Sequence, residues 1–138
     1  YFAMESLGSF KVNINSVIEN LETVILSSEI LPINYKRENY VIVGSRSHMS
    51  VETEAFFEQK KKEHGNVEIM AVGSSLKLCM VAEGKADAYP RYAPTMEWDT
   101  GAGHAIAKYA GFSVKQYNSS EDVVYNKENL LNPWFLVN

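Results

Sequence analysis

Four polar side chains in separate segments of the sequence are of the types that bind phosphate groups or metal ions. They are His48 in "GSRSHMS" (44–50), Lys77 in "GSSLK" (73–77), Arg91 at the end of "ADAYPR" (86–91) and Asp99 in "EWDTG" (97–101). An ammonium group and a planar guanidinium both bind phosphate oxygens, the guanidinium through two parallel hydrogen bonds. A carboxylate is a ligand that a hard ion such as Mg²⁺ prefers. The set therefore suits a phosphate or a metal, provided that the fold brings it together.

Each of these residues also has an ordinary explanation. In "GSSLK", Ser74 lies three residues before Lys77 and shares its helix face, so hydroxyl, backbone amides and ammonium could cradle a phosphate, and Gly73 would allow close approach. A serine N-cap followed by a solvated lysine explains the same segment and is favoured by the segment alone. A loop histidine is usually exposed, Arg91 could form a surface ion pair, and an aspartate before a helix is a common N-cap.

Alternating strand and helix patterns place the four residues at one edge of a sheet. We predict strands over 39–45, 67–73, 86–91, 112–117 and 133–138, and helices over 50–65, 74–84 and 100–111. In the second helix, Leu76, Cys79, Met80 and Val81 are expected to face inward. This pattern predicts an α/β fold with three layers, α/β/α, around a mixed, mostly parallel central sheet. Ligands of such sheets gather at the carboxyl ends of the strands, where all four residues fall.

Composition narrows the class of protein. The 138 residues have a net charge of −4 and include 46% hydrophobic residues, enough for the core of one domain. The charge gives no broad basic face for a nucleic-acid polymer. The single cysteine, Cys79, excludes an internal disulfide, no stretch is apolar enough to span a membrane, and we expect a cytoplasmic protein. His104 and Cys79 are predicted to be packed, and zinc, P-loop, GxSxG and dinucleotide patterns are missing.

The stretch from 73 to 111, "GSSLKLCMVAEGKADAYPRYAPTMEWDTGAGHAIAKYAG", resembles the C-terminal signature of the inositol-monophosphatase superfamily, whose second motif reads W-D-x-A-A-G before a helix. Within that superfamily, "SRSH", "GSSLK" and "YPR" are similar to the 3'(2'),5'-bisphosphate nucleotidases of bacterial sulfate assimilation. The resemblance runs along the whole chain, is most specific over 73–104, and is weak over 13–37. It implies the C-terminal lobe of the sugar-phosphatase fold over 37–138, with 1–36 as the end of the preceding lobe and a connector.

The resemblance also implies an activity and roles for individual residues. Such an enzyme uses Mg²⁺ to remove the 3'-phosphate of adenosine 3',5'-bisphosphate, giving AMP and phosphate. Asp99 would be a catalytic metal ligand that also contacts the substrate. The other substrate contacts implied are Ser45, His48, Gly73, Ser74, Lys77 and Arg91.

One departure from the family limits what this chain could do alone. The family's other metal ligands lie in an upstream glutamate and a D-P-x-D-G-T motif, and neither occurs in this sequence. Because the sequence also begins without Met, we expect a fragment of a longer enzyme that is inactive without the N-terminal lobe. Two alternatives stay open: an inositol or sugar phosphatase of the same superfamily, and a short phosphate-binding module without catalysis.

Overall fold

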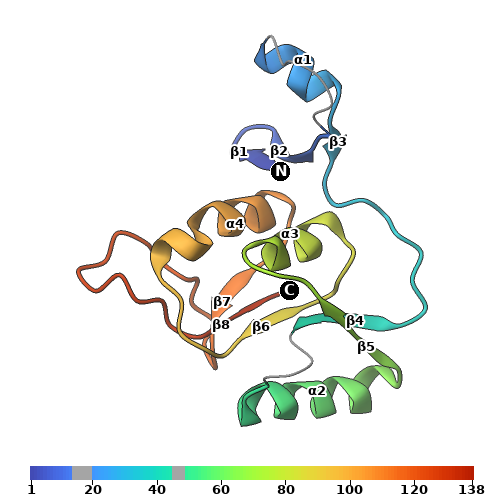
Figure 1. Ribbon diagram of the computed structural model, residues 1–138, viewed down its shortest axis with the longest axis vertical. Helices are drawn as coiled ribbons and strands as arrows, with labels where there is room; N and C mark the ends of the chain where they lie inside the picture. The colour runs from blue at the N-terminus through green and yellow to red at the C-terminus, as the bar shows by residue number, and fades with distance from the viewer. Residues whose placement is uncertain (14–19, 45–48) are drawn as a thin grey trace.

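A computed structural model describes residues 1–13, 20–44 and 49–138 and shows a layered arrangement of short strands and helices (Figure 1). In chain order the elements are β1 (Phe2–Met4), β2 (Gly8–Lys11), α1 (Leu21–Leu26), β3 (Glu29–Ile30), β4 (Tyr40–Gly44), α2 (Val51–His64), β5 (Val67–Ala71), α3 (Leu76–Glu83), β6 (Tyr89–Arg91), α4 (Glu97–Tyr109), β7 (Val114–Gln116) and β8 (Phe135–Val137). The predicted strands and helices beyond residue 37 are all present, with ends shifted by a few residues.

The central sheet is mixed, as the sequence predicts. Strand β4 pairs in parallel with β5, and a parallel bridge between Ile42 and Ala88 connects β4 to the segment that leads into β6. On the other side, β8 lies between β6 and β7 and is antiparallel to both. The sheet is therefore less parallel than expected. The segment between β7 and β8 contains no helix, so β8 does not have to return in the parallel direction.

Helices cover both faces of this sheet, which confirms the three-layer prediction. Helix α2 lies on one face, while α3 and α4 pack side by side on the other (Figure 1). Helix α2 begins after Ser50, whose hydroxyl accepts the Thr53 amide, and ends at Gly65 with φ of 78°. These are the start and stop signals that the sequence contains.

The prediction of the buried face of α3 is wrong at one residue. Leu76 is the first residue of the helix and is 47% exposed. Leu78 is buried instead and packs against Gly103 of α4, where an added Cβ would lie 3.0 Å from the Leu78 Cβ. The missing side chain at Gly103 therefore sets how closely α3 and α4 approach, and both helices contribute to the candidate site.

The N-terminal strands form a separate small sheet on α4. Strands β1, β2 and β3 are antiparallel, and β1 and β2 contact α4. The Ser9 hydroxyl is buried and donates to the Ile106 carbonyl over 2.7 Å. These contacts join residues 1–11 to the α/β layers, while the domain boundary at residue 36 stays a prediction.

Candidate active site

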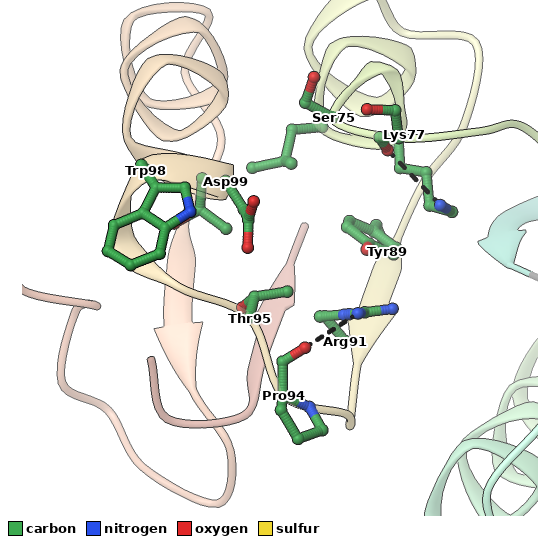
Figure 2. Close-up of a pocket in the computed structure, with 11 residues that line it drawn as sticks. Ser75, Lys77, Tyr89, Arg91, Pro94, Thr95, Trp98 and Asp99 are labelled. Atoms are coloured by element: carbon green, nitrogen blue, oxygen red, sulfur yellow. Dashed lines mark hydrogen bonds between the residues drawn. The ribbon is translucent and has the colours of Figure 1, made fainter. Parts of the chain in front are cut away.

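A pocket of about 410 Å³ lies where α3 begins, β6 ends and α4 begins (Figure 2). The start of α3 contributes Lys77, β6 contributes Arg91, and α4 contributes Asp99. The complete lining consists of Ser74, Ser75, Lys77, Leu78, Tyr89, Arg91, Pro94, Thr95, Trp98, Asp99 and Thr100. Three elements that are separate in sequence thus place their polar ends around one cavity.

Two cations form one wall of this pocket. Lys77 is half-buried, its Nζ lies 5.9 Å from the centre of the Tyr89 ring, and burial followed by the charge of Arg91 lowers its pKa. The Arg91 Nη2 donates to the Pro94 carbonyl over 3.0 Å, and its buried Nε has no partner among residues 1–13, 20–44 and 49–138. Among those residues, neither cation forms an ion pair. Two like charges without a carboxylate between them favour the binding of an anion.

Asp99 faces the same pocket from α4. Its carboxylate points into the cavity (Figure 2). The charged ends of Lys77 and Arg91 lie on the opposite side of the cavity and point away from the Asp99 carboxylate, toward the side of α2. Asp99 is the third residue of α4, not its N-cap as predicted, and its Oδ2 accepts the Met96 amide over 2.9 Å. The helix begins earlier because residues far along the chain hold its first turn: the Glu97 amide donates to the Leu130 carbonyl. The carboxylate therefore caps the helix with one oxygen and has a second oxygen for another ligand.

The residues around Asp99 fit one part of a metal site. The lining includes the hydroxyl of Thr95 as a further oxygen atom, and an exposed carboxylate is a suitable Mg²⁺ ligand. The buried Thr100 hydroxyl already accepts the side chains of Asn132 and Tyr125. The part of the chain that the structure describes holds no group of three or more His, Cys, Asp or Glu side chains placed to bind a metal. Asp99 thus fits as a single ligand, and the described residues do not form a complete centre.

The structure brings together four of the seven residues singled out from the sequence. Ser74, Lys77, Arg91 and Asp99 line the pocket, and Ser74 adopts a left-handed φ of 53° in the turn before α3. Gly73 is exposed and does not line it. Ser45 and His48 lie outside the described residues. The functional roles of all seven stay predictions.

A second, smaller cavity lies on the other side of the two cations, and sequence reasoning did not find it. Its volume is about 140 Å³, and it shares Lys77, Tyr89 and Arg91 with the first pocket. The start of α2 contributes Ser50 and Thr53. Its described lining contains no acidic side chain. The hydroxyl residues at the start of α2 are the feature of the sequence that could have indicated this cavity, but ordinary helix capping explains them equally well.

Two further predictions concern residues near the site. Cys79 is buried, as expected, and burial raises the pKa of its thiol. His104 is also buried, as expected, with its Nδ1 2.9 Å from the Tyr125 hydroxyl, and burial lowers its pKa.

In the described part of the chain, no helix is long and apolar enough to cross a lipid bilayer.

Comparison with known proteins gives a consistent result. The sequence pattern of the inositol monophosphatase family matches residues 1–134. The 3'(2'),5'-bisphosphate nucleotidase CysQ of Escherichia coli K12 is 42% identical over 97 residues, which cover 70% of this chain and 38% of that protein. The crystal structure of CysQ from Bacteroides thetaiotaomicron, described as a bacterial member of the inositol monophosphatase family, superimposes with a TM-score of 0.89 at 50% identity.

The match to these relatives is partial in length. The alignment covers 98% of this chain and 51% of the Bacteroides protein, so the chain spans about half of that relative. Inositol monophosphatase II of Staphylococcus aureus is 19% identical with a TM-score of 0.59 over 80% of this chain, which supports the fold alone. Members of this family are generally metal-dependent phosphatases. With a family pattern that matches nearly its whole length, this chain belongs to the inositol monophosphatase family.

Proposed function

We propose that this chain is the C-terminal part of a Mg²⁺-dependent phosphatase that hydrolyses the 3'-phosphate of adenosine 3',5'-bisphosphate. One observation carries the proposal: the Asp99 carboxylate and the Lys77–Arg91 pair line one pocket, built from three separate elements. Similarity to CysQ proteins, which are named as 3'(2'),5'-bisphosphate nucleotidases, supports the choice of substrate.

The two adjoining cavities suit a substrate with two phosphates. The cavity beside α2 offers the cations of Lys77 and Arg91, and the hydroxyls of Ser50 and Thr53, without a carboxylate. The larger pocket offers the same cations on one side and Asp99 on the other. A negatively charged phosphate is repelled least in the cavity without an acid, while the phosphate that reacts needs a metal beside it. We therefore assign the 3'-phosphate to the Asp99 side and the second phosphate to the α2 side.

The residues of this chain bind and orient the substrate for hydrolysis. Arg91 and Lys77 neutralise phosphate oxygens and hold the nucleotide in one orientation. Orientation and charge neutralisation of this kind lower the barrier to hydrolysis. Asp99 would hold one metal ion. A Mg²⁺ ion bound there would supply polarisation of phosphoryl oxygens, a water of lowered pKa and a positive charge for the leaving oxygen. One water molecule is added across the P–O bond, the 3'-oxygen leaves with a proton, and the products are AMP and inorganic phosphate.

The chain needs further carboxylates for this reaction. A Mg²⁺ site of a phosphatase uses several acids and waters, whereas the described pocket contains Asp99 as its one acidic side chain. We propose that the other ligands come from a part of the protein that corresponds to the half of the Bacteroides relative that this chain does not cover.

A substrate panel tests the proposal on the complete protein that contains this chain. We expect Mg²⁺-dependent phosphate release from adenosine 3',5'-bisphosphate, none from 5'-AMP, and none after chelation of the metal. Adenosine 3'-monophosphate lacks the second phosphate, so it should react with a clearly higher KM. Preference for an inositol or sugar phosphate would identify the first alternative, and nucleotide binding without turnover would identify the non-catalytic module.

A further inference from the structure

The buried side chain of Asn132 holds the segment that leads into α4. Asn132 is 4% exposed, and its Nδ2 donates to the Met96 carbonyl over 2.8 Å and to the Thr100 hydroxyl over 2.9 Å. Thr95 Oγ1 lies 3.2 Å from the same nitrogen. The Asn132 backbone amide also donates to the Thr95 carbonyl over 2.8 Å. One side chain thus fixes both ends of the turn that contains Asp99.

Asn132 is connected to the Asp99 carboxylate through a single residue. The carbonyl of Met96 accepts the Asn132 side chain, and the amide of Met96 donates to Asp99 Oδ2. Thr100, which follows Asp99, is 3% exposed and lines the pocket. A shift of Met96 or Thr100 would therefore move the carboxylate.

Local hydrogen bonds join Asp99 to Met96, but they fix the carboxylate only relative to Met96 and not relative to the rest of the fold. The N-cap of α4 is Met96, whose thioether is at best a weak hydrogen-bond acceptor, whereas Ser, Thr, Asp or Asn would normally occupy this position. The segment before β8 supplies the support instead, through the antiparallel bridge between Met96 and Leu131 and the bond from the Glu97 amide to Leu130.

The orientation of the Asn132 amide agrees with this role. Its Oδ1 is buried and has no hydrogen-bond partner among the residues that the structure describes. Burying an amide oxygen in this way is unfavourable, so the hydrogen bonds that Nδ2 donates must offset the cost of the unpaired Oδ1. The contacts to Met96 and Thr100 are therefore what the side chain contributes.

We infer that Asn132 is a positioning residue for the metal-binding carboxylate of Asp99, acting through Met96 and Thr100. The inference rests on the proposed function, in which Asp99 binds the metal. Partners that orient a metal ligand typically contribute a factor of about 10 to 100 to metal affinity or activity.

Metal binding can be followed without turnover. Trp98 is 68% exposed and adjacent to Asp99, so it can sensitise the luminescence of Tb³⁺, a hard ion that prefers oxygen ligands. In the complete protein, Asn132→Leu should lower the affinity for Tb³⁺ by about 10- to 100-fold. The affinity for Mg²⁺, measured by the displacement of Tb³⁺, should fall by a similar factor. The kcat should fall with it, while the nucleotide KM at saturating Mg²⁺ stays unchanged, because Lys77 and Arg91 lie on other elements.

Two controls separate positioning from general loss of stability. Val123→Ala removes a core side chain that is 3% exposed in the same β7–β8 connection, and it should lower the Tm without changing Tb³⁺ affinity. At Thr100, Val removes the hydroxyl and should weaken Tb³⁺ binding, whereas Ser keeps the hydroxyl and should restore it. Because the Thr100 hydroxyl also accepts the Tyr125 hydroxyl, Tyr125→Phe removes that bond alone and should leave the Tb³⁺ affinity unchanged. With this control, the Thr100 pair decides the question if Asn132→Leu does not fold.

The outcomes distinguish the inference from the function on which it rests. Unchanged Tb³⁺ affinity in folded Asn132→Leu, or equal affinity in Thr100→Val and Thr100→Ser, would overturn the positioning role alone. A wild-type protein that binds neither Tb³⁺ nor Mg²⁺ would overturn the metal role of Asp99 and the inference together.

Discussion

Replacing Glu83 with glutamine should lower the free energy of unfolding by about 3 kcal/mol near neutral pH. Glu83 ends α3 and is completely buried, and it joins the N-terminal segments to the core. Its carboxylate accepts the Tyr1 hydroxyl at 2.5 Å, Lys11 Nζ at 2.6 Å and the Tyr35 hydroxyl at 2.7 Å, and Lys85 Nζ lies at 2.9 Å.

The magnitude follows from the pKa of this carboxyl group. Burial alone would raise the pKa of Glu83, but the hydrogen bonds from Lys11, Tyr1, Tyr35 and Lys85 outweigh it and lower the pKa from 4.5 to about 2. Lowering a pKa by one corresponds to about 1.4 kcal/mol, so the charged form contributes about 3 kcal/mol to folding. A lowered folded-state pKa means that this contribution is complete above the unfolded-state pKa and is lost as the pH falls toward 2.

Urea unfolding of wild type and Glu83→Gln at a series of pH values tests this reasoning. The difference in unfolding free energy should be constant above about pH 5.5 and should shrink steadily below about pH 4.5. Other carboxyl groups titrate in both proteins and cancel in the difference. A difference below about 1 kcal/mol at pH 7, or one that does not depend on pH, would contradict the role given to the buried charge.

Three further predictions concern the site and its scaffold. Lys77→Ala should weaken the binding of adenosine 3',5'-bisphosphate, measured by calorimetry. Because the pKa of Lys77 is lowered, the affinity of the wild type should decline as the pH rises toward 10.5, and Lys77→Arg should remove that decline. Equal declines in the two proteins would contradict the role given to Lys77. In urea unfolding, Gly103→Ala should destabilise the fold by about 1 kcal/mol, because the added methyl group would contact Leu78. Gly101→Ala should stabilise it by about 1 kcal/mol, because the nearest atom there, in Tyr125, is 3.7 Å away and alanine favours a helix. The reverse order would refute the packing argument. Residues 1–138 alone should release no phosphate from the bisphosphate in a Mg²⁺-dependent assay, and clear turnover would show that no further carboxylates are needed.

The parts of the fold that local signals determine could be predicted from the sequence. Ser50 and Gly65 act within their own helix, so the predicted start and end of α2 are confirmed. The predicted start of α4 is wrong, because its first turn depends on Leu130 and Asn132, about thirty residues away in the chain. The direction of β8 likewise depends on tertiary pairing rather than on local pattern.

The same distinction applies to the candidate site. Lys77, Arg91 and Asp99 could be grouped because strand ends and helix starts meet at one sheet edge, and the pocket contains all three. Asn132 could not be found in this way, since its part comes from burial and from contacts with Met96 and Thr100. The helical pattern around Glu83 predicts only that it lies in a helix, and the packing of the N-terminal segments shows why a buried carboxylate is tolerated there.

Phosphate release by Asp99→Asn in the complete protein tests the central claim most directly, namely that Asp99 is a metal ligand of a phosphatase. The asparagine oxygen can still accept the Met96 amide, so the stability of the fold should change by less than about 1 kcal/mol. We predict that the Mg²⁺-dependent release of phosphate from adenosine 3',5'-bisphosphate falls by more than about a hundredfold. Near-normal turnover in a stable variant would contradict the claim and leave Asp99 as a helix cap.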